Sequence, residues 1–270
     1  WIQPAEGDAG GSLGAALAYW YLELNNERND TNKDEMRGSY LGPSYSNENI
    51  EKSLKQIGAK YEFIEDEILI DKVADDLSKG NAIGWFQGRM EFGPRALGGR
   101  SILGDPRSET MQKNLNLKVK YRESFRPFAP SVLREDVNKW FDLNNDSPYM
   151  LIVSDVSKDK QNQMSEDEKR LFGIDKLNIK RSEIPAVTHV DYSARIQTVH
   201  KETNKMYYNL IKKFKEITNC PVIVNTSFNV RGEPIVNSPE DAFNCFMGTE
   251  LDNLVIGNYY LQKNKQDSSL

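Results

Sequence analysis

The stretch from Met90 to Arg107, MEFGPRALGGRSILGDPR, sets glycines among arginines in a pattern suited to holding an anion. Arginine presents a planar fork of N–H donors that matches phosphate and carboxylate oxygens. Glycine lets the backbone approach a ligand and turn its amide N–H groups toward negative charge. Because the whole chain carries a formal net charge of −5, any such site has to be local. The stretch therefore predicts a site for a phosphate-bearing small ligand.

The basic character continues beyond this stretch. Nine cations and four acids lie between residues 89 and 126, a local charge of +5. The cations are Arg89, Arg95, Arg100, Arg107, Lys113, Lys118, Lys120, Arg122 and Arg126. Composition alone leaves three interpretations open: a salt-bridged surface loop, a phosphate site, or a nucleic-acid groove with interleaved aromatic side chains. A P-loop is excluded because Gly99-Arg100 stands where Gly-Lys is required. The Rossmann dinucleotide-binding fingerprint is absent as well, because no GxGxxG follows a predicted strand.

A second polar group follows a predicted buried strand in PVIVNTSFNVRGEPIV. Asn225, Thr226, Ser227 and Asn229 lie at or just beyond the carboxyl end of that strand. This end of a strand is the usual place for a ligand in an open sheet. A turn stabilised by Asn and Ser side chains is the alternative.

The remaining reactive residue types are few. His189, Asp191 and Arg195 come together in THVDYSARIQTV, and His200 is the only other histidine. Two cysteines without a CxxC spacing exclude a disulfide scaffold and a Cys-rich zinc site, which favours a reducing cytoplasm. The sequence pI of about 5.3 argues against general affinity for nucleic acids or anionic membranes, and no apolar run is long enough to span a bilayer.

The elements that would position these residues alternate irregularly, which predicts a mixed α/β sheet with long excursions. At 270 residues the chain is long enough for one large domain or two modest ones. Helices are predicted at 46–58, 71–79, 108–117, 206–217 and 238–247, and strands at 81–88, 221–227 and 254–261. Ser46 or Asn47, Ser108 and Ser238 are the predicted N-caps, and Pro239 fits the first helical position of the last helix.

The two least regular segments lie near the N-terminus and in the middle of the chain. The first residue is Trp1 rather than Met, and a Gly-rich turn leads directly into a helix with Leu13, Leu17, Trp20 and Leu24 on one face. This start predicts a portion of a longer protein. The polar residues 157–181 predict a mobile surface insertion.

Four motifs together carry a resemblance to a known family. GRMEFGPRALGGRSILGDPR, KVKYRESFRPFAPSVL, IPAVTHVDYSARIQTV and NTSFNVRGEPIVNSPEDA closely resemble the C-terminal half of the NodU/CmcH carbamoyltransferases and occur in the family order. These enzymes O-carbamoylate antibiotics, Nod factors and related sugars. The similarity covers about residues 80–262. PAEGDAGGSLGAAL also resembles the end of the family's N-terminal ASKHA-type domain.

The resemblance implies a YrdC-like α/β fold, a twisted open sheet flanked by helices. Residues 35–270 would form this domain, with residues 80–262 as its core. Residues 1–34 would be a short helical remnant of the ASKHA-type carbamoyl-transfer domain.

In that family the YrdC-like domain forms carbamoyl-adenylate from ATP and carbamoyl phosphate, and the actin-like domain passes the carbamoyl group to an acceptor hydroxyl. The K-x-R…S-x-N signature maps onto Lys120, Arg122, Ser227 and Asn229, which the resemblance implies are catalytic. Substrate and nucleotide binding would involve Arg95, Arg126, Arg195, Asn225 and Thr226.

The resemblance also bears on cofactors. ATP would bring Mg²⁺. Fe²⁺ is expected only in the full-length protein, because the His-x₃-His metal ligands lie in the domain that is missing here, and Asp8 is the one matching carboxylate. The third motif departs from the family where Tyr192-Ser193 replaces Gly-Thr. A tyrosine at this position either narrows the pocket or lies outside it.

A rival hypothesis is a non-catalytic YrdC-like module that binds nucleotide or RNA. The acidic net charge and the complete signature disfavour it. A purely structural role is the third alternative. The expected partners are ATP, carbamoyl phosphate and an acceptor hydroxyl compound reached through the missing domain, with no membrane. A homodimer is left open.

Overall fold

One nine-stranded sheet organises the computed structural model, which describes residues 2–29, 34–177 and 179–267. The strand order is β1-β9-β8-β2-β3-β7-β4-β6-β5. The strands are β1 (Glu62–Phe63), β2 (Ile83–Phe86), β3 (Arg100–Gly104), β4 (Ala129–Leu133), β5 (Ile152–Asp155), β6 (Ser193–Val199), β7 (Val222–Ser227), β8 (Asn253–Ile256) and β9 (Tyr259–Gln262). β2 pairs parallel with β8 and β4 with β6, and the other neighbours are antiparallel. The expected mixed α/β sheet is confirmed.

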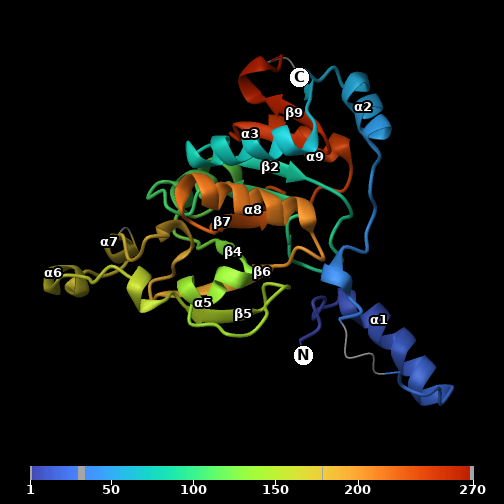
Figure 1. Ribbon diagram of the computed structural model, residues 1–270, viewed down its shortest axis with the longest axis horizontal. Helices are drawn as coiled ribbons and strands as arrows, with labels where there is room; N and C mark the ends of the chain where they lie inside the picture. The colour runs from blue at the N-terminus through green and yellow to red at the C-terminus, as the bar shows by residue number, and fades with distance from the viewer. Residues whose placement is uncertain (1, 30–33, 178, 268–270) are drawn as a thin grey trace.

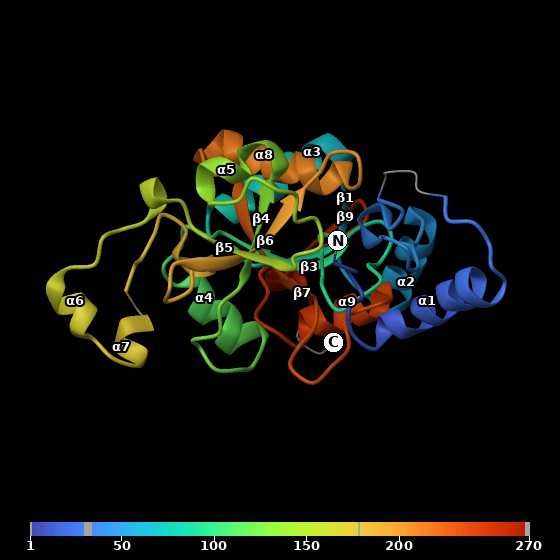
Figure 2. The same cartoon turned by 90° about the horizontal axis from the view of Figure 1, so that it is seen from below.

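Helices cover both faces of this sheet (Figures 1 and 2). α3 (Asp66–Ser78) and α8 (Lys205–Thr218) pack against each other on one face, beside the short α5 (Val137–Trp140). α4 (Met111–Asn114) and α9 (Pro239–Met247) lie on the other face, and α2 (Asn47–Gln56) packs against α9. Their apolar side chains meet those of the strands in one main core.

Short helical turns connect these elements. Two π-helices are η1 (Tyr19–Glu23) and η3 (Leu115–Val119). The 3₁₀ turns are η2 (Arg37–Ser39), η4 (Arg134–Asp136), η5 (Lys158–Lys160), η6 (Pro185–Val187) and η7 (Lys263–Lys265).

The helix starts follow from local chemistry. Ser238 Oγ accepts a hydrogen bond from Asp241 N at 3.1 Å, and the Asp241 carboxylate accepts one from Ser238 N at 2.9 Å. This capping box and Pro239 at the first helical position fix the start of α9, as predicted. Ser46 caps α2 through its hydroxyl, which accepts a hydrogen bond from Asn49 N at 3.3 Å.

Three details of the predicted elements are wrong. The helix after Arg107 starts at Met111 with Thr110 as its N-cap, because Ser108 Oγ lies 3.3 Å from Thr110 Oγ1 instead of capping a helix. The predicted last strand is a hairpin of β8 and β9, because Gly257 has φ +55° and turns the chain. The helical spacing of Met206, Leu210, Ile211 and Phe214 in the helix predicted at 206–217 places Ile217 on the same apolar stripe, but Ile217 is 45% exposed, since it lies in the last turn of α8.

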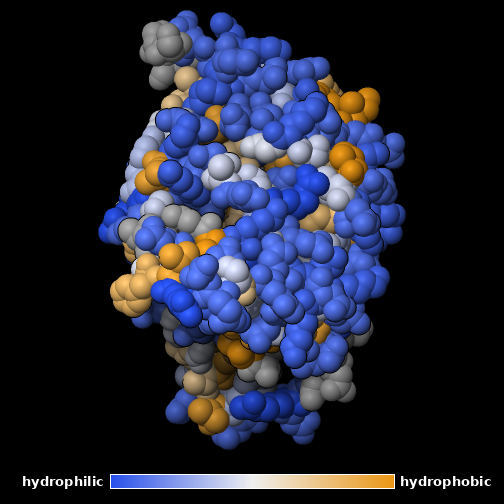
Figure 3. All heavy atoms as spheres, turned by 90° about the vertical axis from the view of Figure 1, so that its left-hand side faces the viewer, coloured by the Kyte–Doolittle hydropathy of each residue, from blue (hydrophilic) through white to orange (hydrophobic). Residues whose placement is uncertain are grey.

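Two segments project from opposite ends of the molecule (Figures 1 and 2). α1 (Ala9–Ala18) and η1 contain no buried residue, and the predicted apolar face of this helix leaves Leu17 and Trp20 exposed. α6 (Glu166–Arg170) and α7 (Ile174–Leu177) form the other projection. Seen from the α6–α7 end, the surface is mostly hydrophilic, with small groups of hydrophobic atoms (Figure 3). None of the helices in the described ranges combines the length and the apolar character that crossing a bilayer requires.

Candidate active site

Lys120 is a buried cation held by the loop that follows β7. Its Nζ lies 2.7 Å from Asn229 Oδ1, 2.9 Å from Asn229 O and 3.2 Å from Ser227 Oγ, and it also donates to Ser227 O. Ser227 Oγ and Asn229 Oδ1 are 2.7 Å apart. Only 4% of Lys120 is exposed. The structure therefore brings together three residues of the predicted signature, which we call the Lys120 cluster (Lys120, Ser227 and Asn229).

The surroundings of Lys120 disfavour its positive charge. Burial, together with the charge of the nearby Arg122 guanidinium, lowers the pKa of Lys120 to about 7. Its four acceptors are neutral oxygens of Ser227 and Asn229, so no carboxylate among the described residues compensates the ammonium group. An anionic ligand would supply the missing negative charge.

Arg122, the fourth signature residue, is fixed by Asn116. Arg122 Nε donates to Asn116 Oδ1 at 2.6 Å, and its guanidinium lies over the Phe128 ring, 5.0 Å from the centroid. Asn116 Nδ2 donates to Ser124 O at 3.1 Å and to Arg126 O at 2.8 Å. Among the described residues, no hydrogen bond uses the terminal Nη atoms of Arg122. They are free to donate to a ligand beside the Lys120 cluster.

Arg126 lies near Arg122 but at the surface. Burial is the main cause of a lowered pKa for Arg122, and the charge of Arg126 is the next cause. Arg126 Nε is 3.4 Å from Glu123 Oε2, and Arg231 Nη1 is 3.5 Å from Glu123 Oε1. Glu123 therefore compensates the exposed cations of this turn, while Arg122 and Lys120 carry the buried positive charge.

A cavity of about 660 Å³ adjoins the Lys120 cluster. Its lining includes Tyr121, next in sequence to Lys120, and Val230 and Glu233 from the loop that carries Asn229. Asp241, Asn244 and Cys245 from α9 also line it. This volume lies within the range of small-molecule sites. Because the lining also holds the carboxylates of Glu233 and Asp241, the cavity suits the less polar body of a ligand whose anionic end would contact Lys120.

Arg95 and Arg195 form a separate pair. Arg95 lies in the loop between β2 and β3, and Arg195 lies on β6. Burial is the first cause of a lowered pKa for Arg195, and the charge of Arg95 is the second. The Nε atoms of both arginines are buried and have no hydrogen-bond partner within the described residues. We refer to them as the arginine pair.

Asn225 and Thr226 lie outside both groups of cations. Asn225 is 1% exposed, and its Nδ2 donates to Gln197 Oε1 at 2.8 Å and to Ala96 O at 3.1 Å. Gln197 Nε2 donates to Leu97 O at 2.8 Å. This buried network ties β7 and β6 to the loop that carries Arg95. Thr226 is half-buried and lies opposite Ile102 of β3.

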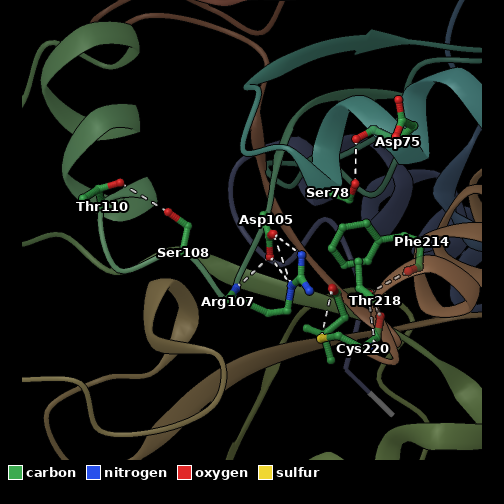
Figure 4. Close-up of polar contacts among 10 residues, drawn as sticks. Asp75, Ser78, Asp105, Arg107, Ser108, Thr110, Phe214, Thr218 and Cys220 are labelled. Atoms are coloured by element: carbon green, nitrogen blue, oxygen red, sulfur yellow. Dashed lines mark hydrogen bonds and ion pairs between the residues drawn. The ribbon is translucent and has the colours of Figure 1, made fainter.

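Two arginines of the basic stretch are structural. Arg100 is fully buried, stacks 3.5 Å from the centroid of Phe86, and donates to four backbone carbonyls, those of Pro43, Gln87, Gly88 and Gly99. Arg107 pairs with Asp105 through its Nε and Nη2 atoms, the latter at 2.6 Å, and lies over the Phe214 ring (Figure 4). A structural role therefore accounts for Arg100 and Arg107, without a ligand.

Sequence reasoning missed two residues that hold these groups in place. Glu91 Oε1 accepts backbone hydrogen bonds from Leu97 N at 2.6 Å and Gly99 N at 2.7 Å, and burial raises the pKa of Glu91. Asn116 holds the turn after Lys120 in place through its side-chain hydrogen bonds to Arg122, Ser124 and Arg126. Each is a polar residue flanked by apolar ones, Met90 and Phe92 or Leu115 and Leu117, and that is the available sequence signal.

Three other predicted positions lie away from the Lys120 cluster. His189 Nδ1 is 3.3 Å from Ser193 Oγ, in a turn that Asp191 also supports. Tyr192 donates to Asn162 O at 3.2 Å and does not line the cavity beside Lys120. Asp8 is at the N-cap position of α1, and within the described ranges no three His, Cys, Asp or Glu residues are grouped as a metal would need. One carboxylate does not fit an iron site.

Comparisons with known proteins agree with these motifs. The family model described as "Carbamoyltransferase C-terminus" matches residues 74–263. A Synechocystis protein is 61% identical over 98% of this chain and 44% of its own length. The nodulation protein NolNO of Sinorhizobium fredii is 40% identical over 97% of this chain and 36% of its own length. The 3'-hydroxymethylcephem-O-carbamoyltransferase of Amycolatopsis lactamdurans is 33% identical over 72% of this chain and 33% of its own.

These similarities cover most of this chain, while the chain spans less than half the length of each of these relatives. Among solved structures, full-length HypF in a phosphate- and nucleotide-bound form overlaps 70% of the chain with a TM-score of 0.44 and 18% identity. The family model covers well over half of the 270 residues and includes every residue of the Lys120 cluster and of the arginine pair. The chain belongs to the carbamoyltransferase C-terminus family.

Proposed function

We propose that this chain forms carbamoyl-adenylate from ATP and carbamoyl phosphate, within a protein that passes the carbamoyl group to an acceptor hydroxyl. The observation that supports this most directly is the buried ammonium of Lys120. It is held by neutral oxygens, lies near a guanidinium with free Nη atoms, and adjoins a cavity of about 660 Å³. The Lys120 ammonium has no carboxylate partner among the described residues, and a nucleotide phosphate would supply the missing negative charge.

The proposed reaction has two balanced steps. Water first cleaves carbamoyl phosphate to carbamate and inorganic phosphate. A carbamate oxygen then attacks the α-phosphorus of ATP, the new O–P bond forms, and the bond from the α-phosphorus to the bridging oxygen breaks. Pyrophosphate leaves with that electron pair. No protein nucleophile is required, because positioning and charge neutralisation suffice for transfer at phosphorus.

Each signature residue has a role within this scheme. The Lys120 ammonium and the free Nη atoms of Arg122 stabilise the charge that develops on the phosphate oxygens. Ser227 and Asn229 hold the Lys120 ammonium in place, and Arg126 donates to phosphate from the rim. The cavity between the 230–237 loop and α9 accommodates the nucleoside, and Mg²⁺ accompanies the triphosphate.

The test is mass spectrometry of the full-length chain incubated with ATP, Mg²⁺ and carbamoyl phosphate. We expect carbamoyl-AMP and pyrophosphate from the wild type, and a loss of product of about a hundredfold or more in Lys120→Ala. Lys118→Ala is the matched control, because Lys118 lies two residues away but is exposed and paired with Glu250 at 2.8 Å. Its product yield should equal that of the wild type.

Other outcomes separate the rival functions. ATP binding that Lys120→Ala abolishes, without any product, would support a nucleotide-binding module instead of an enzyme. Equal product from wild type and Lys120→Ala would remove Lys120 from the site. The absence of both product and ATP binding in a folded sample would contradict the proposal.

A further inference from the structure

Tyr121, between Lys120 and Arg122, has a backbone conformation that a bulky residue rarely adopts. Its φ is +47°, in the left-handed region. Lys120 is the C-cap of the π-helix η3, so Tyr121 takes the next position, where Gly or Asn usually relieves this strain. Arg122 N donates back into η3, to Asn116 O at 3.0 Å, and this bond fixes the turn. An aromatic residue at a strained position beside a buried cation points to a role for its side chain.

The turn at Tyr121 is fixed against the C-terminal end of α9. Tyr121 Oη donates to Gly248 O at 2.8 Å, and Gly248 is the C-cap of α9. Two residues further on, Glu250 N donates to Lys118 O at 3.0 Å. These bonds hold the Tyr121 ring at the helix end, yet 53% of Tyr121 stays exposed. A half-exposed ring that its own hydroxyl holds in place can accept a flat group with little loss of side-chain freedom.

The face of α9 that lines the cavity continues from Gly248 toward the start of the helix. Together with Tyr121, the cavity of about 660 Å³ is lined by Asp241, Asn244, Cys245 and Gly248, whose spacing of three and four residues is that of one helix face. Asn244 precedes Gly248 by one turn, about 6 Å along the axis. Asn244 is exposed, and no hydrogen bond among the described residues uses its carboxamide. The ring and the carboxamide are therefore both available to a ligand at neighbouring positions of the cavity lining.

The charges around the cavity set the direction of a nucleotide within it. Asn229 joins the cavity to the Lys120 cluster, because its Oδ1 accepts from Lys120 Nζ at 2.7 Å and its Nδ2 donates to Glu233 O at 2.8 Å. Glu233 and Asp241 bring two carboxylates to the cavity lining. These carboxylates repel a phosphate, whereas the Lys120 ammonium attracts one. A nucleotide would therefore place its phosphates at the Lys120 cluster and its base toward Tyr121 and α9.

We propose that Tyr121 and Asn244 recognise the base, in that a purine stacks on the Tyr121 ring and Asn244 selects adenine. That the ligand is a nucleotide rests on the proposed function. A purine offers two fused rings to an aromatic side chain and a pyrimidine offers one, so stacking favours the purine. The Asn244 carboxamide can donate to N7 of adenine and accept from its exocyclic amino group. Guanine presents two acceptors at the same edge, N7 and O6, and leaves the carboxamide oxygen without a donor.

The first test is calorimetric titration of the full-length chain with ATP and with CTP. We expect Tyr121→Leu, which keeps an apolar side chain but loses the aromatic face, to bind ATP about five- to fiftyfold more weakly. Its affinity for CTP should fall less, so the preference for ATP over CTP narrows by at least about threefold. Tyr121→Phe loses the bond to Gly248 but keeps the ring, and should retain that preference. Tyr19→Leu is the matched control, because Tyr19 is 62% exposed and is not among the cavity-lining residues.

A second titration, with ATP and GTP, tests Asn244. The wild type should prefer ATP, and Asn244→Ala should reduce this preference about fivefold or more, mainly through weaker binding of ATP. Asn144→Ala, an exposed asparagine outside the cavity lining, should leave the preference unchanged. An unchanged preference in Asn244→Ala would overturn the role of Asn244. Equal losses of ATP and CTP affinity in Tyr121→Leu, or a lost preference for ATP over CTP in Tyr121→Phe, would overturn the stacking role of Tyr121.

Failure of this inference is distinguishable from failure of the proposed function. Inorganic tripolyphosphate carries the phosphates of ATP without the base, so Tyr121→Leu and Asn244→Ala should bind it as the wild type does, and Lys120→Ala should bind it more weakly. If Tyr121→Leu weakens tripolyphosphate binding as much as ATP binding, Tyr121 does not recognise the base. Selective nucleotide binding as described, without carbamoyl-AMP formation, would leave this inference standing and contradict the proposed function. Carbamoyl-AMP formation by Tyr121→Leu with the ATP affinity of the wild type would contradict this inference alone.

Discussion

The charge state of Lys120 depends on the ligand that it contacts. Its ammonium is buried among neutral oxygens, and burial together with Arg122 lowers the pKa to about 7. A nucleotide phosphate beside it would favour the charged form and raise that pKa again. Binding of ATP at this site would therefore be coupled to the uptake of a proton near neutral pH.

This coupling predicts a pH dependence of ATP affinity. As the pH rises above about 7, the free protein loses the Lys120 proton and has to regain it on binding. The affinity should weaken by up to about tenfold for each pH unit above that pKa, until the pKa of the bound state is reached. Calorimetric titration with ATP at several pH values measures this slope. Lys120→Ala should bind weakly with no such slope, and a flat profile in the wild type would contradict the prediction.

At the scale of elements, the π-helix η3 and the turn after it act as one unit. Lys120 N donates to Leu115 O at 2.9 Å, and Arg122 N donates to Asn116 O at 3.0 Å. Asn116 is fully buried and adds three side-chain hydrogen bonds to residues 122–126. One amide therefore sets the direction of Arg122 and the path of the turn that carries Arg126.

Replacing this amide should affect the site more than the fold around it. Asn116→Ala removes the partner of Arg122 Nε, so we expect an affinity for ATP about tenfold lower and a loss of about 1–3 kcal/mol in the free energy of unfolding. Asn114→Ala, an exposed asparagine in the preceding helix, is the control and should change neither quantity. Titration with ATP and chemical unfolding measure the two effects. Unchanged ATP affinity in Asn116→Ala would show that Arg122 is oriented by other contacts.

At the scale of the whole molecule, the exposed cations are distributed beside acids. Lys118 pairs with Glu250, both Arg126 and Arg231 with Glu123, and Lys180 with Glu109. The net charge of −5 is consistent with this pattern. Such a surface offers little attraction to a nucleic-acid backbone.

Affinity for RNA should therefore be weak and should depend on these acids. A mobility-shift assay with single-stranded RNA should show no complex for the wild type at physiological ionic strength. The double variant Glu123→Gln/Glu250→Gln frees three cations and should gain a shift that added salt removes. A salt-dependent shift by the wild type would instead favour the RNA-binding alternative.

The sequence predicted the elements whose signals are local. The Ser238–Pro239–Asp241 start of α9, the Ser46 cap of α2 and the strand that ends at Ser227 are confirmed, because caps and apolar runs act over a few residues. The apolar residues on both sides of Gly257 predict a single strand. The composition of this segment does not show that the chain turns at Gly257 and forms the hairpin of β8 and β9.

The site was partly predictable for the same reason. The motif pattern named Lys120, Ser227 and Asn229, which do meet in space. It did not separate Arg95 and Arg195 from that cluster, or identify Glu91 and Asn116, because these roles depend on strand order and loop packing between residues far apart in the chain. Residues 30–33, within the expected N-terminal remnant, lie outside the described residues.

The order of the strands also has a consequence for synthesis of the protein. β2 and β3 pair with each other early, but their outer partners are β8 and β7, and β7 begins only at Val222. At ribosomal speeds the wait from Gly104 to Val222 is roughly 6–24 s. During that time a hairpin with buried residues such as Trp85 exposes both of its edges. A nascent chain of this design needs protection from edge-to-edge association until the ribosome has passed Gln262 and the sheet closes around its middle.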